Sequence, residues 1–197
     1  MEIAGFIVSI LGAFGAGAFA NHFLARRREE SAEQRAVSRT EYEEDRAQAL
    51  KLLDLAEEMR RELGPRWDTD EPFAERYVAV LTQRTAEIET SNRRLHDPTL
   101  RLSVVWVPGL LGFAAESLKE TEHRQAVLLA DQALQELEGN AEAFVGKRPP
   151  SIMSDLYKAY YDELRPLGDV DHSPHARVER IYERWEQSVK LANSRSS

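Results

Sequence analysis

The N-terminal part of this chain contains a long segment without a charged side chain, residues 3–25. As a helix it would be roughly 35 Å long at about 1.5 Å per residue, enough to cross a hydrocarbon layer of about 30 Å. Three arginines, Arg26, Arg27 and Arg28, follow it directly. We therefore predict that residues 1–25 form a single membrane-spanning helix.

Three other interpretations of residues 3–25 compete with a membrane span. A cleaved signal peptide would explain residues 18–20, because Ala-Phe-Ala fits the small-x-small cleavage pattern. However, no positive residue precedes the apolar stretch, and the arginines behind it would resist translocation. Apolar runs in core helices are usually shorter, and an interfacial helix needs a polar face that this segment lacks.

The charge bias around the predicted span indicates its orientation. Only Glu2 precedes the span, whereas Arg26, Arg27 and Arg28 follow it. Because positive residues are retained on the cytoplasmic side, we expect the N-terminus outside and the rest of the chain in the cytoplasm. This predicts a single-pass protein of the plasma (inner) membrane. The three arginines would fix this topology, and they can also bind anionic lipid headgroups.

One face of the predicted span consists of small residues. They recur at helical spacing and comprise Gly5, Ser9, Gly12, Ala13, Ala16 and Gly17. Small residues in line let two helix backbones approach closely, which is how membrane helices associate in lipid. We expect this face to pair with a second copy of the chain, giving a homo-oligomer, or with a partner membrane helix.

The composition excludes several function classes. The chain has 34 acidic and 26 basic residues, a net charge of −8, and so lacks the basic footprint of a general nucleic-acid-binding protein. It contains no cysteine, which rules out thiol catalysis and cysteine-based zinc sites. Phosphate-cradling glycine loops, nucleophile elbows and HExxH motifs are also absent from the sequence. We therefore expect no nucleic-acid partner, no cofactor and no enzymatic activity.

The residues after the span predict an all-α protein. Residues 26–48 are mostly charged or small and contain neither Pro nor Gly, so they predict a solvated helical stalk that continues the span. From Ala49 onward apolar residues recur with helical period, and residues 49–193 predict a cytosolic antiparallel helical bundle. Residues 194–197 predict a disordered tail.

The most apolar stretch beyond the span is residues 102–115. Its fourteen uncharged residues are too few for an ordinary second span, and Pro108 interrupts them. We predict a buried central helix that is kinked at Pro108. A segment that contacts or re-enters the membrane is the alternative, and a short strand over residues 104–107 has no visible partner strand.

Two further helical regions follow the apolar stretch. We expect a new helix to begin near residues 117–120 and to reach about Phe144, with Gly139-Asn140 ending or bending it. A short aromatic helix and a final helix come after a proline-containing linker. Their aromatic residues lie at helical spacing and predict core packing rather than a ligand cage; they are Tyr157, Tyr160, Tyr161, Tyr182 and Trp185.

The loop before the final helix holds the side chains best suited to bind a metal ion. Carboxylate and imidazole groups can bind a divalent cation, and four of them stand close together as Asp169, Asp171, His172 and His175. The same loop also fits a helix start, with Ser173 as the cap and Pro174 in the first turn. We favour the helix start, because a single loop lacks the distant ligand and supporting shell of real metal sites.

Together these patterns predict a membrane-tethered helical scaffold or interaction module that acts through protein contacts in the cytoplasm. The abundance of Ala, Arg and Glu is typical of a GC-rich bacterial genome. One alternative is a phage-exclusion or toxin-like effector that perturbs the membrane through the span and residues 102–115. Another is a membrane-anchored, metal-dependent hydrolase that uses the loop at residues 169–175.

The small-residue face can be tested in a membrane two-hybrid assay. Gly12→Ile and Gly17→Ile should each weaken self-association, because a branched side chain keeps two helix backbones apart. Ile10→Val, on the opposite face, is the matched control and should retain the signal. An unchanged signal in both glycine variants would remove the hypothesis.

Overall fold

A computed structural model of the chain describes residues 36–63, 72–120, 124–164 and 171–195. Within these ranges the chain forms helices and turns and contains no strand, so the all-α prediction is confirmed. Several sequence predictions lie outside the described residues: the span at residues 1–25, its small face of Gly5, Ser9, Gly12, Ala13, Ala16 and Gly17, the arginines Arg26, Arg27 and Arg28, and Asp169.

The chain divides into two compact units, Met1–Glu43 and Glu44–Ser197. In the first unit, residues 36–43 are described, and all of them are helical. Their side chains are mostly exposed, and the Thr40 hydroxyl donates to the Ala36 carbonyl oxygen at 3.0 Å. A hydroxyl bonded to the preceding turn is a common arrangement for threonine on a solvated helix.

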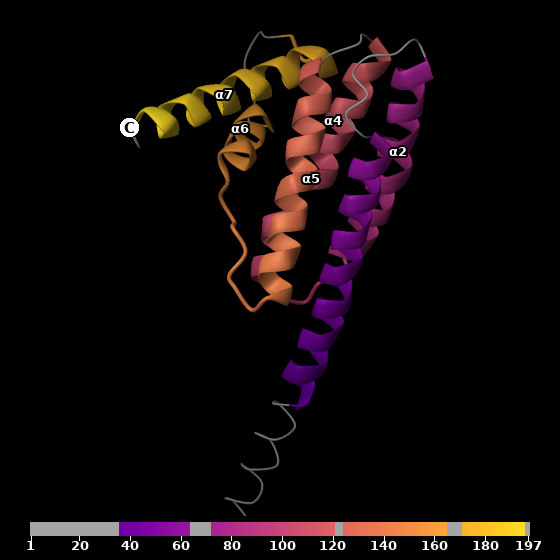
Figure 1. Ribbon diagram of the computed structural model, residues 1–197, viewed down its shortest axis with the longest axis vertical. Helices are drawn as coiled ribbons and strands as arrows, with labels where there is room; N and C mark the ends of the chain where they lie inside the picture. Colours follow the sequence, from indigo (N-terminus) through magenta and orange to yellow (C-terminus); the bar gives the residue numbers. More distant parts are fainter. Residues whose placement is uncertain (1–35, 64–71, 121–123, 165–170, 196–197) are drawn as a thin grey trace, which may run out of the picture. The chain divides into compact units, whose positions relative to one another are not determined.

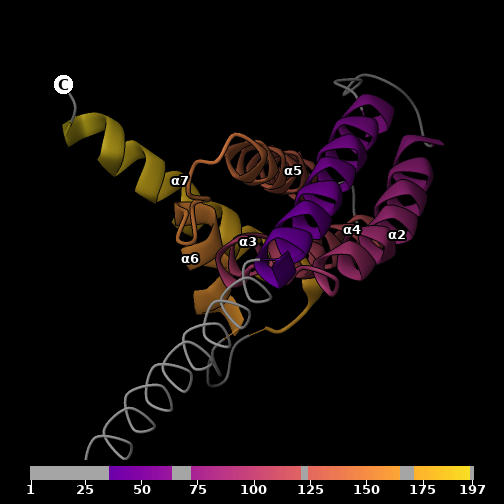
Figure 2. The ribbon, with the colours of Figure 1, turned by 90° about the horizontal axis from the view of Figure 1, so that it is seen from below.

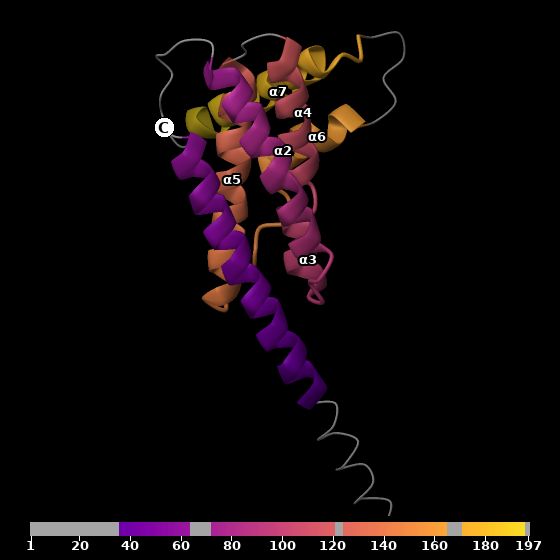
Figure 3. The same ribbon diagram turned by 90° about the vertical axis from the view of Figure 1, so that its right-hand side faces the viewer.

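The second unit begins with the helical residues 44–63. Four helices follow: α2 (Pro72–Asn92), α3 (Pro98–Val104), α4 (Val107–Glu120) and α5 (Arg124–Val145). Figure 3 shows that α2 runs opposite to α3 and α4, and that α5 runs opposite to α4. Neighbouring long helices are therefore antiparallel, as the short connections between them favour.

Two more helices complete this unit, α6 (Asp155–Leu164) and α7 (Pro174–Arg195). Figure 1 shows α7 lying across the ends of α4 and α5 rather than alongside them. Seen from below in Figure 2, α6 and α7 occupy the side away from α2. The bundle is thus antiparallel through α5 and is closed by a crossing helix.

Helix α4 lies at the centre of the core. It packs against α2, α5 and α7, and its side chains at Val107, Leu110, Leu111 and Ala114 are fully buried. Burial of each such leucine contributes roughly 1.5–3 kcal/mol to folding, which explains why the most apolar stretch takes the central position. The prediction of a buried central helix is confirmed for α4.

The position of the predicted kink needs correction. The helix does not bend at Pro108 but breaks just before it, at Val105 and Trp106, which separates α3 from α4. Proline is still the cause, because it has no amide hydrogen and its ring excludes the carbonyl four residues earlier. That carbonyl belongs to Val104, and it accepts a hydrogen bond from Asn92 Nδ2 at 3.2 Å instead.

A second asparagine, Asn140 of α5, secures the same break from the other side. Its Nδ2 donates to the Ser103 carbonyl oxygen at 3.2 Å, and its Oδ1 accepts from the Ser151 amide at 2.8 Å. Helix α5 therefore continues through Gly139-Asn140 to Val145, contrary to the expected end or bend. Asparagine disfavours helices by competing for local backbone groups, and here distant partners occupy its side chain.

The boundary between α4 and α5 also differs from the sequence prediction. Residues 117–120 do not begin a helix but end α4, and α5 begins at Arg124. The reason is that the buried face of α4 extends through Ser117 and Leu118, which are 0% and 6% exposed.

In the part of the chain that the structure describes, Pro98–Lys119 is the one helical stretch that is long and apolar enough to cross a membrane by length and composition. Within its apolar window, 56% of the residues are buried inside the bundle. Such burial is typical of a core helix, and a core helix passes the same test of length and composition.

The Tyr160 side chain of α6 lies so close to Gly109 of α4 that a side chain at position 109 would overlap it. A methyl group there would lie 3.0 Å from Tyr160 Cζ and closer still to its hydroxyl, whereas one at Gly112 would meet no atom within 4 Å. The Tyr160 ring cannot easily turn away, because the rings of Trp106 and Phe113 lie 6.2 Å and 5.8 Å from it.

Gly109→Ala should therefore lower the free energy of unfolding by about 1–3 kcal/mol through overpacking. Gly112→Ala in the same helix is the matched control and should raise it by about 0.5–1 kcal/mol, because alanine favours helix over glycine. Urea unfolding of the full chain measures both. Equal effects of the two substitutions would show that the α4–α6 contact is not tight.

Candidate functional site

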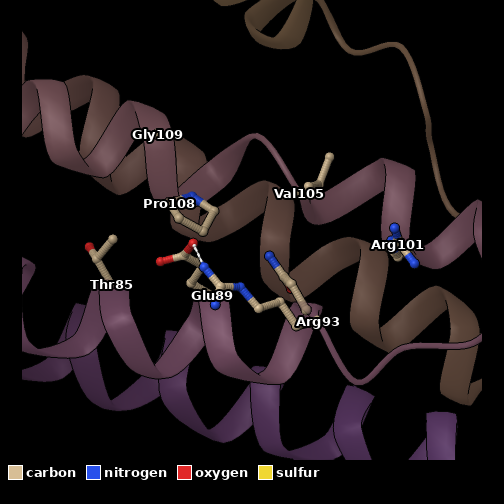
Figure 4. A pocket seen from close by; sticks show the side chains of 8 residues that line it. Thr85, Glu89, Arg93, Arg101, Val105, Pro108 and Gly109 are labelled. Carbon is tan, nitrogen blue, oxygen red and sulfur yellow. Dashed lines mark hydrogen bonds and ion pairs between the residues drawn. The ribbon is translucent and has the colours of Figure 1, made fainter.

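A groove of about 450 Å³ lies over the break between α3 and α4. This volume falls within the range of roughly 300–1,000 Å³ that is typical of small-molecule sites. Two segments line it: α2 with Thr85, Glu89, Asn92 and Arg93, and the α3–α4 segment with Arg101, Val105, Pro108 and Gly109 (Figure 4).

The local sequence explains why a hollow forms here. Thr85, Glu89 and Arg93 follow one another at intervals of four, so they share one face of α2. Across from them the helix is interrupted before Pro108. Figure 4 shows Pro108 at the start of α4, across from Thr85 and Glu89.

Two buried polar atoms in the groove lining have no hydrogen-bond partner among the described residues. They are Thr85 Oγ1 and Asn92 Oδ1. Asn92 is only 4% exposed, and its Nδ2 is already committed to the Val104 carbonyl. A buried polar atom without a partner costs about 1–3 kcal/mol, and most buried polar atoms in proteins are satisfied. Both atoms are shielded from solvent.

Of the three charged side chains that line the groove, two form an ion pair with each other and one does not. Arg93 Nη2 lies 2.5 Å from Glu89 Oε1, so these two charges offset each other. Arg101 makes no ion pair with any described residue and is exposed. The lining thus carries two arginines and one glutamate, a net charge of +1, in a chain whose net charge is −8.

Asp45 holds the turn between α2 and α3, a role that the sequence analysis did not predict. It lies in the segment predicted as a solvated stalk but is 2% exposed. Its two carboxylate oxygens accept from the backbone amides of His96 and Asp97, both at 2.7 Å. Asp97 in turn caps α3 by accepting from the Leu100 amide at 2.8 Å. The α2–α3 turn is therefore held by a carboxylate about fifty residues away in sequence.

The loop before α7 has the helix-start arrangement that the sequence favoured. Ser173 Oγ accepts from the Ala176 amide at 3.3 Å, and α7 begins at Pro174. Asp171 Oδ1 accepts from the Ser173 amide at 2.8 Å, and this bond holds the pKa of the Asp171 carboxyl below its usual value. His172 is exposed and His175 is half-buried.

The metal hypothesis for this loop depended on Asp169, Asp171, His172 and His175. Asp169 lies outside the described residues, so the full set of four is not placed. Across the described ranges, no group of three or more His, Asp or Glu side chains is arranged to hold a metal ion.

A buried carboxylate, Glu163 of α6, anchors this loop to the bundle. Its side chain is 0% exposed and receives Arg180 at 2.6 Å and Arg184 at 3.3 Å. Arg180 Nη2 also donates to the Asp171 carbonyl oxygen at 2.8 Å, and its hydrogen bond to Glu163 raises the pKa of Arg180. Sequence periodicity did not indicate this cluster, because its members come from two helices and the loop between them.

The aromatic residues of α6 pack mainly on the α3–α4 segment. The Trp106 ring lies 6.0 Å from Tyr157 and 6.2 Å from Tyr160, and Phe113 lies 5.8 Å from Tyr160. Burial raises the pKa of the Tyr160 phenol. These contacts have the centroid spacing of ordinary aromatic core packing. Tyr161 differs from the others, because 49% of it remains exposed.

Comparison with family models, with curated proteins and with solved structures finds no match to this chain. Its function therefore has to be inferred from the residues and contacts described above.

The Glu163 cluster makes a prediction about stability. Glu163→Gln should lower the free energy of unfolding by about 2–3 kcal/mol, because it leaves two arginines without their carboxylate. Glu116→Gln removes an exposed carboxylate that pairs with Lys119 three residues away, and it should change stability by less than about 0.5 kcal/mol. Thermal unfolding compares the two, and a neutral Glu163→Gln would mean that the cluster contributes no net stability.

Proposed function

We propose that this chain is a membrane-tethered helical interaction module, whose bundle binds partners at the cytoplasmic face of a bacterial plasma membrane. The observation that carries the proposal is the uncharged segment at residues 3–25, followed at once by Arg26, Arg27 and Arg28. This combination favours insertion of the segment into lipid and retention of the arginines in the cytoplasm.

A tether of this kind would raise the effective concentration of the bundle for any partner in the same membrane. The charged composition of residues 26–43 supports a solvated spacer between the membrane and the bundle, whereas the buried Asp45 already belongs to the bundle. Partners can be other proteins, and association of the spans through the small-residue face would make the module oligomeric.

The groove supports binding rather than catalysis. Among the described residues, no base is hydrogen-bonded to the Thr85 hydroxyl to make it a nucleophile, and the Glu89 carboxylate is paired with Arg93. What remains is the positive charge of the exposed Arg101, which makes no ion pair with a described residue and is open to a partner.

The bundle also exposes apolar side chains that suit protein contacts. Leu102 and Val105 beside the groove are 54% and 51% exposed, and Met153 in the linker before α6 is 67% exposed. Single exposed apolar residues are common on any protein. These therefore support the proposal only together with the predicted membrane tether.

Fractionation of cells that express the full chain tests the proposal. We expect the protein in the membrane pellet, released by detergent but not by high salt or alkaline carbonate, because burial of the apolar segment holds it there. A variant that lacks residues 1–25 is the matched control and should move to the supernatant. Full-length protein in the supernatant would refute the tether and with it the proposed function.

A further inference from the structure

We propose that one face of the bundle lies against the anionic headgroup layer of the membrane that the proposed span crosses. This inference rests on the proposed function for the tether and adds that the bundle itself contacts lipid. The face is built by α3, by the linker before α6 and by α6. Its exposed apolar side chains, which define the α3–α6 face, are Leu102, Val105, Ile152, Met153, Tyr161 and Leu164.

Exposed apolar side chains are concentrated on this face. Ten large apolar side chains are exposed among the described residues, and six of them belong to the α3–α6 face. Val105 also lines the groove, but Figure 4 shows its side chain pointing away from α2. Single exposed apolar residues occur on any protein, whereas a group of them in one region marks a surface that contacts another body.

Hydrogen bonds and ring contacts show that the segments of this face adjoin one another. The Asn140 side chain bonds the Ser103 carbonyl at 3.2 Å and the Ser151 amide at 2.8 Å, so it joins α3 to the linker. The Trp106 ring lies 6.0 Å from that of Tyr157, which joins the end of α3 to α6. Figure 2 accordingly shows α3 beside α6. The exposed apolar side chains of the three segments therefore come from one region of the surface.

Helix α6 contributes tyrosine rings to this region. Tyr157 and Tyr161 are four residues apart and stack with their centroids 5.9 Å apart, so they share one side of the helix. Leu164, three residues further on, continues that side. A tyrosine combines an apolar ring with a polar hydroxyl, and it is enriched where proteins meet lipid headgroups. These side chains therefore suit the boundary between water and hydrocarbon.

Positive charge borders the α3–α6 face. Arg101 directly precedes Leu102, and Lys147 and Arg148 stand at the start of the linker. All three basic side chains are exposed and make no ion pair with a described residue, although the chain as a whole has a net charge of −8. Lysine and arginine near an anionic membrane surface are attracted to it, and each one adds to the binding.

The charge favours a membrane over a second copy of the chain as the partner of this face. A symmetric dimer would bring the same basic side chains of both copies to one interface, and like charges there oppose association. An anionic bilayer offers negative headgroups to the basic side chains and apolar groups beneath them to the exposed apolar ones. The combination of apolar, aromatic and basic residues therefore fits anionic lipid.

The tether is short enough for the bundle to reach the membrane. Residues 26–43 separate the predicted span from the second unit, and as a helix these eighteen residues would be about 27 Å long. Helix α5, with 22 residues, is itself about 33 Å long. A bundle of this length on such a tether can tilt until one of its sides meets the lipid.

Site-specific fluorophores test the contact, because the chain has no cysteine that would compete for the label. Full-length Met153→Cys carries the label on the face, and Ala79→Cys, an exposed residue of α2, is the matched control. Both proteins are reconstituted into vesicles of phosphatidylglycerol and phosphatidylcholine in which some headgroups carry a nitroxide quencher. We expect quenching at position 153 to be at least about twofold stronger than at position 79.

Both the lipid charge and the basic residues should matter. Vesicles of phosphatidylcholine alone, or raised ionic strength, should reduce the quenching of labelled Met153→Cys. Adding Lys147→Gln and Arg148→Gln should shift the contact equilibrium toward release by roughly 30-fold, about fivefold for each charge. Arg61→Gln with Arg76→Gln is the matched control, because both arginines are exposed and stand near the connection between residues 63 and 72.

A label on Leu24→Cys, at the inner end of the predicted span, reports on the tether separately. Quenching there without quenching on Met153→Cys would leave the tether in place and overturn the lipid contact of the bundle. The contact is also overturned if positions 153 and 79 are quenched alike, if phosphatidylcholine alone serves as well, or if the two pairs of charge substitutions behave alike. Disulfide-linked dimers of unlabelled Met153→Cys in the vesicles would assign the face to a second copy instead.

Discussion

Hydrogen bonds from two buried asparagines to the interrupted central helix hold the described bundle in its form. Pro108 leaves the Val104 carbonyl without its helical donor, and the break also opens the Ser103 carbonyl to outside partners. Asn92 of α2 and Asn140 of α5 each donate to one of these carbonyls. Without Asn92 the buried Val104 carbonyl would lose its side-chain donor, and without Asn140 the Ser103 carbonyl would keep only the indole N–H of Trp106, which donates to it at 3.0 Å. The same break produces the groove, so stability and the candidate site have one origin.

Two buried carboxylates of the bundle act as connectors between segments. Asp45 accepts two backbone amides of the α2–α3 turn, and Glu163 receives two arginines of α7. A carboxylate with several donors offsets the cost of leaving water, which a buried carboxylate without partners does not. In both places the carboxylate fixes a connection between helices that the apolar core alone would leave less defined.

Much of the helical architecture could be predicted from the sequence, because helical periodicity, proline and capping residues act locally. The caps of α7, the central burial of α4 and the absence of strands in the described ranges follow from such local signals. Pro108 also predicted an interruption of the central helix, but not that it would fall at Val105 and Trp106. The burial of Asp45 and the groove did not follow, because each depends on a partner from a distant segment and periodicity carries no information about which segments meet.

The use of Asn140 to complete the break has a consequence for the order in which the chain folds during synthesis. Asn140 emerges from the ribosome 37 residues after Ser103, whereas Asn92 precedes Val104 by 12. The first half of the bundle can thus give each carbonyl a donor, Asn92 for Val104 and the Trp106 indole for Ser103, but the second donor to Ser103 must wait for α5. Until then the apolar residues of α4 stay partly uncovered, and a nascent chain in this interval is the form most prone to aggregate or to need a chaperone.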